Sequence, residues 1–420
     1  MSELQPQQRP SPFAYPDFRW FWTARLGSTL AQSLIVIVIG WQVYGLARTV
    51  MEPKAAAFQL GLVGLIQFLP LFLLTPVTGW AADHFDRRTI ARSCCALQFA
   101  AAALVGVLTV ADRLSLPGLF VAAALLGVAR AFLQPSLAAL APNLVPAAVM
   151  PRAIATTSIA TRVGAILGPA AGGLLYGLSR GLPYAASCAA LLISFVGLTL
   201  VRAGRRAANT PARRPLSQMA EGLRYVARNR LVLGAISLDL FTVLLGGATA
   251  MLPIFARDIL HIGATGLGEL RAAPAVGALA SALWFSRRPL RRRVGLKMLI
   301  AVGVFGTATV GFGLSRSLPL SLACLTILGA ADMLSVYVRQ SLIQISTPDA
   351  MRGRVGAVST LFVSASNELG EAESGFLASA VGPVGSVILG GVGAVLVTVL
   401  WAWWFPVLRK ADGFEPQADP

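Results

Sequence analysis

Ionisable side chains lie inside long apolar stretches of this chain, where a charge is costly. A charged group at membrane depth costs roughly 3 kcal/mol or more and usually faces a cavity or a partner. Asp332 and Arg339 are seven residues apart and so share one helical face. A carboxylate there can exchange protons and an arginine can hold an anion, or such residues can form buried pairs that fix helix register. The set is Arg25, Arg130, Arg162, Asp239, Glu269, Arg271, Asp332, Arg339, Glu368, Glu371 and Glu373.

Three carboxylates fall within six residues of one apolar stretch, at Glu368, Glu371 and Glu373. Packing alone does not explain them. Helical spacing places Glu368 and Glu371 on one face and Glu373 on another. Two interpretations stay open, a proton or cation site and a cluster of hydrogen-bonded, partly protonated acids.

A short charged loop joins two apolar stretches through Gly79, Asp83, Arg87 and Arg88. The glycine permits close helix approach. Asp83 ends a helix, where its carboxylate can pair with Arg87 or face the positive end of a neighbouring helix. An ordinary charged loop that sets topology would have the same composition.

A run of small residues follows Arg162 in the stretch 151–177. Small residues four apart make a smooth face for close helix packing, and a proline inside a helix removes a hydrogen bond and can bend it. The motif is also compatible with generic packing. Its members are Arg162, Gly164, Gly168, Pro169, Gly172 and Gly173.

These residues are positioned by apolar runs of about 20 residues, the length of a membrane-spanning helix. The chain has 420 residues, of which 56% are hydrophobic and 13% charged, about half the charge of an ordinary soluble domain. We expect an all-α membrane protein with twelve spans in two six-helix halves. The spans are 19–46, 57–82, 89–110, 117–142, 151–177, 181–202, 229–256, 263–286, 294–314, 318–346, 352–380 and 383–406.

The two halves repeat one another. A shift of 202 residues places Leu126–Arg130 over Leu328–Asp332, Gly168 over Gly370 and Pro169 over Glu371. Repeats of this length in hydrophobic chains are typical of transporters. We expect a disordered cytoplasmic N-terminus at 1–16, a first half at 17–202, a linker at 203–228, a second half at 229–406 and a cytoplasmic tail at 407–420. An amphipathic surface helix is expected over 216–226 of the linker.

The net charge of +17 lies mainly in alternate loops, for example at Arg87, Arg88 and 287–297. Excess Lys and Arg mark cytoplasmic loops, so both termini are expected in the cytoplasm. We interpret the positive charge as a topology signal that contacts anionic lipid, and not as a nucleic-acid binding surface. The four cysteines lack metal or redox spacing, and a phosphate-binding G-x-x-x-x-G-K-[ST] loop is not found. We expect no enzyme activity, no cofactor, no metal and no nucleic-acid partner.

The strings Ala82–Arg88, Arg162–Gly164, Thr347–Arg354 and Asn367–Gly375 resemble the major facilitator superfamily, over the whole of 17–410. Within it the chain is similar to the enterobactin-exporter-like branch, the transmembrane secretion effectors. The resemblance implies that spans one, four, seven and ten line a central cavity. It also implies that Asp83 contacts the start of span eleven near Thr347, so that the loop with Gly79, Arg87 and Arg88 acts as a cytoplasmic gate. The glycine motif of span five is, by the same resemblance, typical of antiporting exporters. The residues on cavity spans are Arg25, Arg130, Asp239, Asp332 and Arg339.

Together these features predict a proton-coupled exporter of a small amphipathic molecule, a siderophore or a drug, that works by alternating access. Arg130 and Asp332 occupy equivalent positions of the repeat, and we expect them to face one another across the path. The expected setting is the bacterial inner membrane, with protons, lipid and a small molecule as partners and a monomeric state. The alternatives are uptake by proton symport, and a non-transport protein such as a scramblase or membrane enzyme.

Overall fold

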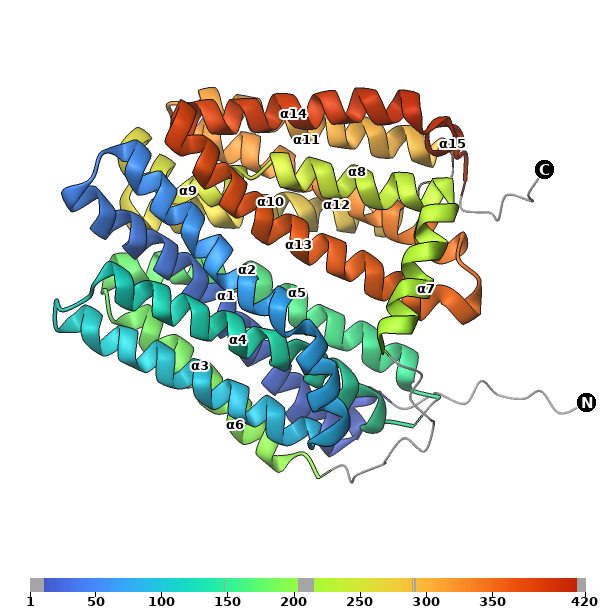
Figure 1. Ribbon diagram of the computed structural model, residues 1–420, viewed down its shortest axis with the longest axis horizontal. Helices are drawn as coiled ribbons and strands as arrows, with labels where there is room; N and C mark the ends of the chain where they lie inside the picture. The colour runs from blue at the N-terminus through green and yellow to red at the C-terminus, as the bar shows by residue number, and fades with distance from the viewer. Residues whose placement is uncertain (1–10, 147, 203–214, 289, 291, 414–420) are drawn as a thin grey trace, which may run out of the picture. The chain divides into compact units, whose positions relative to one another are not determined.

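The computed structural model of the chain describes residues 11–146, 148–202, 215–288, 290 and 292–413, and long helices dominate it (Figure 1). In lipid, a helix satisfies all its backbone hydrogen bonds within one segment. The long helices are α1 (Pro16–Val50), α2 (Pro53–His84), α3 (Arg87–Val110), α4 (Leu116–Leu140), α5 (Met150–Leu178), α6 (Leu182–Leu200), α8 (Arg230–Leu245), α10 (Gly263–Arg287), α11 (Val294–Leu314), α12 (Leu318–Ile345), α13 (Asp349–Val381) and α14 (Pro383–Trp404).

Each of the twelve predicted spans overlaps one of these helices, and the all-α membrane fold is confirmed. Over the described residues, ten segments are long and apolar enough to cross a membrane. The two long helices outside that group are α10 and α13. They carry the charged residues Glu269, Arg271, Glu368, Glu371 and Glu373. The residues that are candidates for proton exchange therefore also lower the hydropathy of these two helices.

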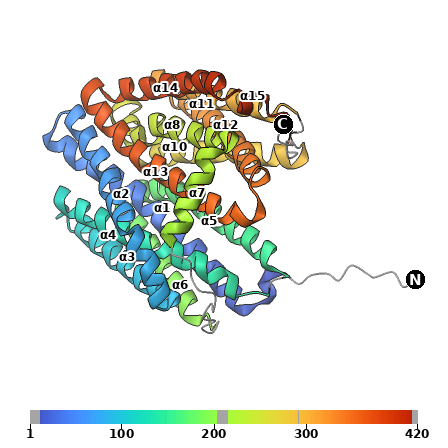
Figure 2. The ribbon, with the colours of Figure 1, turned by 45° about the vertical axis from the view of Figure 1, so that its right-hand side comes forward.

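The chain forms two compact units, Met1–Ile39 with Leu69–Pro211 and Gly40–Phe68 with Ala212–Pro420. Figure 1 and Figure 2 trace the helices of each unit. The helices α1 and α2 each contribute one part to each unit. The end of α1 and the start of α2 therefore make their contacts with the second unit, although they precede it by more than a hundred residues in the chain. The predicted sequence halves, 17–202 and 229–406, stay a prediction.

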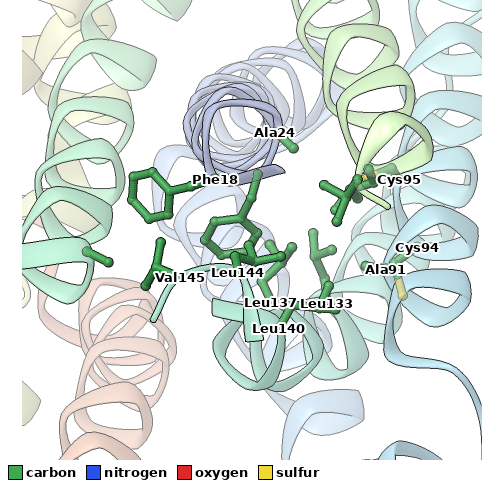
Figure 3. Packing of buried hydrophobic residues seen from close by; sticks show 14 of the residues in the cluster. Phe18, Ala24, Ala91, Cys94, Cys95, Leu133, Leu137, Leu140, Leu144 and Val145 are labelled. Carbon is green, nitrogen blue, oxygen red and sulfur yellow. The ribbon is translucent and has the colours of Figure 1, made fainter. Parts of the chain in front are cut away.

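The first unit is held by an apolar core at the ends of α1, α4 and α5 (Figure 3). Phe18, Leu133 and Leu137 are at most 1% exposed and pack with Cys94 and Cys95 of α3. Burying one such side chain contributes about 1.5–3 kcal/mol. The two cysteines serve here as small apolar side chains, as expected from their spacing.

The second unit packs α11 against α12 and α14, α10 against α12, and α8 against α13. Its main core joins Met298, Val302, Val338 and Trp401. The indole N–H of Trp401 donates to the Ser237 hydroxyl at 3.0 Å. A buried tryptophan thus satisfies its polar group and locks α14 onto α8.

One predicted span is not a continuous helix. The expected helix 229–256 ends at Leu245, and the chain continues through Gly246 and Gly247 into a 3-10 turn (Ala248–Met251), the short α9 (Leu252–Ile254) and a π-helical turn (Phe255–Ile259). Each glycine is about 1 kcal/mol less favourable than alanine in a helix interior, and Pro253 supplies no N–H to continue the pattern. The span is therefore broken near its middle.

The amphipathic helix of the linker is confirmed as α7 (Pro215–Arg228), and residues 203–214 lie outside the described part. Part of its apolar face packs on the protein: Val226 is 3% exposed and Gly222 lies against the backbone of Arg354, whereas Leu223 is 48% exposed. Glu221 pairs with Arg354 at 2.6 Å. The helix is thus docked on the start of α13, and its place on the membrane surface stays a prediction.

Short helical turns lie near both ends of the described chain. Pro12–Ala14 form a 3-10 turn whose Phe13 ring packs on Phe18 and Trp22, so the segment 1–16 expected to be disordered is set too long. Near the other end, α15 (Pro406–Lys410) buries Leu408 completely. Residues 1–10 and 414–420 lie outside the described part.

Candidate functional site

Two of the predicted cavity residues form a buried ion pair within the second unit. The Arg339 guanidinium of α12 donates to the Asp239 carboxylate of α8 at 2.6 Å, and the side chains are 3% and 8% exposed. Breaking a buried pair by removing one partner typically costs about 3–5 kcal/mol. The structure therefore joins Asp239 and Arg339 to each other and ties α8 to α12 by charge.

A cavity of about 290 Å³ lies beside the break that follows α8. The residues that line it come from the end of α8, from the break itself and from α10, α11, α12 and α13. Two are carboxylates and one is an amide, while the rest are apolar or small. They include Gly246, Gly247, Phe305, Asp332, Asn367 and Glu371. A concave apolar site with a few convergent polar groups is the usual form of a small-molecule site.

The glycine pair explains how this cavity and α13 come together. A Cβ on Gly247 would lie 2.7 Å from the Gly370 carbonyl oxygen, and a Cβ on Gly246 would lie 2.8 Å from the Phe305 ring. Irregular backbone at membrane depth is tolerated where it is buried in protein or lines a cavity. The absence of side chains at Gly246 and Gly247 thus allows the break to occur against α13.

The three glutamates of α13 have different surroundings. Glu371 lines the cavity, and Arg271 of α10 interacts with it electrostatically. Glu368 is 7% exposed and buried in the unit. Glu373 is half-buried and accepts a long hydrogen bond from the Ser374 hydroxyl at 3.5 Å. Only Glu371 of the three is among the residues that line this cavity.

The predicted cavity residues of the first unit are Arg25 and Arg130, and both are half-buried. The Arg25 Nε donates to the Thr161 hydroxyl of α5 at 3.1 Å. Its NH1 is buried without a hydrogen-bond partner among the described residues. The expected approach of Arg130 to Asp332 joins residues of different units and stays a prediction.

The glycine motif of α5 packs on α1 inside the first unit. A Cβ on Gly164, Gly168 or Gly172 would lie within 3.0 Å of α1 atoms, including the Leu30 and Leu34 backbones. These glycines are four residues apart and all buried. Pro169 lies inside the helix, Gly173 is buried and Arg162 is exposed. The motif therefore supports close helix packing.

The charged loop secures helix ends of the first unit. Arg87 donates to the Ala139 carbonyl at the end of α4 at 3.2 Å, and Arg88 donates to the Val201 carbonyl at the end of α6. Cations at helix C-termini complement the helix dipole. Gly79 and Asp83 lie in the last turns of α2, and their side-chain contacts are outside the described part of the structure. The gate role predicted for this loop stays a prediction.

Sequence reasoning missed Gly246, Gly247, Phe305 and Asn367 as site residues. The consecutive glycines in an apolar run were the available signal, because interrupted spans often mark transporter sites. Phe305 carries no such signal, since it is one of many apolar residues in its span. Its place in the cavity follows only from how α11 packs in the second unit.

Among the described residues, the long helices and the cavity beside the broken span give the geometry of the candidate site, and solved transporters of the major facilitator type share this fold. Residues 8–417 match the family described as transmembrane secretion effector, and the chain belongs to that family. It is thus a multi-pass membrane transporter and not an enzyme, as expected.

Curated relatives match along almost the whole chain. The enterobactin exporter EntS of Escherichia coli O1:K1 / APEC is 27% identical over 416 residues, which cover 96% of this chain and 95% of that protein. The enterobactin exporter EntS of Citrobacter koseri is 27% identical over 418 residues, with the same coverage.

Solved transporters share the fold. A bacterial homolog of the human lysosomal transporter Spinster, in an inward-facing and occupied conformation, matches with a TM-score of 0.72 and 14% identity, over 94% of this chain and 96% of that one. The POT family transporter PepTSo matches with a TM-score of 0.70 and 11% identity, over 94% and 99%. At these identities the likeness concerns the fold.

Proposed function

We propose that this chain is a proton-coupled exporter of small amphipathic molecules, of the siderophore or drug class, that works by alternating access. The observation that carries the proposal is the cavity of about 290 Å³ that Asp332 and Glu371 line beside the α8 break. Its volume is at the lower end of small-molecule sites. The relatives named as enterobactin exporters support the direction of transport.

Proton coupling needs a group that changes charge between two conformations. A carboxylate at membrane depth is costly while ionised, so protonation of Asp332 or Glu371 changes the relative stability of the two conformations. Asp239 is the weaker candidate because Arg339 already neutralises it at 2.6 Å. Of the acids predicted for proton exchange, Asp332 is therefore the proposed carrier, and Glu371 is its partner in the cavity.

The available energy is sufficient for export. A proton that enters down a potential of 100 mV releases about 2.3 kcal/mol, which supports roughly a fiftyfold gradient of a neutral solute. The proposed setting is the bacterial inner membrane, with both termini and the basic loops on the cytoplasmic side. The proposed functional unit is a monomer.

The test is uphill transport in everted vesicles, with a substrate selected by screening a deletion strain for sensitivity to siderophores and antibiotics. We expect proton-driven accumulation by the parent protein. Asp332→Asn should abolish that accumulation while leaving downhill exchange measurable. The matched control is Asp112→Asn, which removes an exposed carboxylate paired with Arg180 in the first unit. Normal accumulation by Asp332→Asn contradicts the assignment, and accumulation only in vesicles of native orientation would favour uptake by symport.

A further inference from the structure

A single carboxylate accepts two hydrogen bonds from the end of α1. The Tyr44 hydroxyl donates to Asp258 Oδ2 at 2.6 Å, and Arg48 Nε donates to the same oxygen at 2.8 Å. The Arg257 Nε lies 4.0 Å from the other oxygen. Tyr44 is fully buried, while the Arg48 and Asp258 side chains are 27% and 22% exposed. This cluster is built from groups that are complementary in charge and hydrogen bonding.

The contact continues along the segment Gly40–Phe68, which belongs to the second unit. Lys54 donates to the Ala380 carbonyl at 3.0 Å, and Phe58 packs on Phe376 with ring centroids 5.1 Å apart. Further along, a Cβ on Gly61 would lie 2.9 Å from the Gly375 Cα. The segment is thus attached to α13 by packed glycines and aromatic rings, and to Asp258 by charge.

Asp258 lies in the irregular part of its span. It is within the π-helical turn Phe255–Ile259, after the break at Gly246 and Gly247. Single π turns and 3-10 stretches inside helices frequently mark functional sites and hinges. The charged contact therefore connects the end of α1 with the irregular segment that follows the break after α8.

We propose that Tyr44, Arg48 and Asp258 form a clasp that holds segment 40–68 on the second unit in one conformation and releases it when the transporter opens on that side. The inference rests on the alternating access proposed above. In the predicted topology, the clasp lies on the face opposite the basic loops. Bistable contacts of this kind convert a local rearrangement into a change of global state.

The test measures how often the clasp opens. The reporter is Ala57→Cys, in a background where Cys94, Cys95, Cys188 and Cys324 are replaced by serine, because Ala57 is fully buried next to Gly375. The full chain in proteoliposomes is treated with a membrane-impermeant maleimide and the labelling rate is recorded. Neither substrate nor proton gradient is present, so failure of proton coupling leaves this readout intact.

Asp258→Asn should raise the labelling rate about tenfold, which corresponds to about 1.4 kcal/mol of population shift. Tyr44→Phe removes one hydrogen bond with little change in volume and should raise the rate by a smaller factor. Exchanging the charges, with Arg48→Asp and Asp258→Arg together, should bring the rate back toward the parent value. Asp112→Asn breaks the Arg180 pair inside the first unit and should leave the rate unchanged.

The proposal is overturned if both Asp258→Asn and Tyr44→Phe elute as folded protein and label at the parent rate. It is also overturned if Asp112→Asn raises labelling as much as Asp258→Asn, because the effect would then be general loosening. If Asp258→Asn does not fold, Tyr44→Phe decides alone.

Discussion

Equivalent helix pairs of the two units, α5 on α1 and α13 on α8, use the same glycine position for different purposes. Gly168 packs on the Leu30 and Leu34 backbones of α1, and its repeat partner Gly370 packs on the Val243 and Leu244 carbonyls of α8. One residue later, Pro169 stands in α5 where Glu371 stands in α13. The first pair is a packing contact, and the second opens a cavity lined by an acid.

The difference shows how a duplicated membrane scaffold acquires asymmetry. The helix α1 is continuous for 35 residues, whereas its counterpart α8 ends after 16 and is followed by irregular turns. The close glycine contact is kept in both pairs, so the break and the acid were accommodated without loss of packing. The buried ion pair and the cavity both belong to the second unit, whereas the glycine motif of the first unit is a packing contact.

The largest expected effect tests whether charge holds the second unit together. Asp239→Ala should destabilise the protein by about 3–5 kcal/mol, because it leaves the buried Arg339 guanidinium without its partner. The measurement is thermal unfolding of purified protein in detergent. Asp239→Leu combined with Arg339→Met should recover most of the stability. If Asp239→Ala is as stable as the parent protein, the ion pair does not stabilise the second unit.

The next effect separates Glu371 from its repeat partner. Glu371→Gln should lower uphill efflux roughly tenfold or more, because interactions with a charged group contribute about 1.5–3 kcal/mol. Pro169→Ala changes the equivalent position of the first unit and should leave the efflux rate within about twofold, on the argument that α5 contributes packing. Equal losses in both variants would contradict the assigned asymmetry. Initial rates in everted vesicles provide the measurement.

A smaller effect concerns the packing contact itself. Gly168→Ala should destabilise the first unit by about 1–3 kcal/mol, since the new Cβ would lie 2.7 Å from the Ser33 Cβ. The control is Gly303→Ala in α11, where a Cβ meets nothing within 4 Å. That substitution should stabilise the helix by about 0.5–1 kcal/mol. Shifts of the same sign in both variants would show that local helix propensity, and not contact with α1, decides the result.

The smallest expected effect concerns the linker helix, which has no counterpart in the first unit. Glu221→Gln should change stability by at most about 1 kcal/mol, because the ion pair with Arg354 is partly solvent-exposed. Val226→Ala should cost more, since this side chain is 3% exposed. Thermal unfolding of the two variants measures which one is less stable. A larger loss of stability in Glu221→Gln than in Val226→Ala would mean that charge dominates the docking of α7.

Helix positions were predictable because apolar runs of the right length leave few alternatives in lipid. Partners of the charged residues were not. Asp239 and Arg339 were both selected from sequence, but they lie 100 residues apart and their pairing depends on how α8 and α12 pack. The break at Gly246 was missed because hydropathy stays high across it, and hydropathy measures burial in lipid and not backbone continuity.

The shared helices have a further consequence for the lipid environment. At 1.5 Å per residue the 35 residues of α1 extend about 52 Å, whereas the 19 residues of α6 extend about 28 Å. The hydrocarbon layer is about 30 Å thick, so α6 matches it while α1 must tilt or project beyond it. Part of α1 belongs to each unit, so we expect a change in its tilt to affect both. We therefore expect the transport rate to respond to the acyl chain length of the lipid.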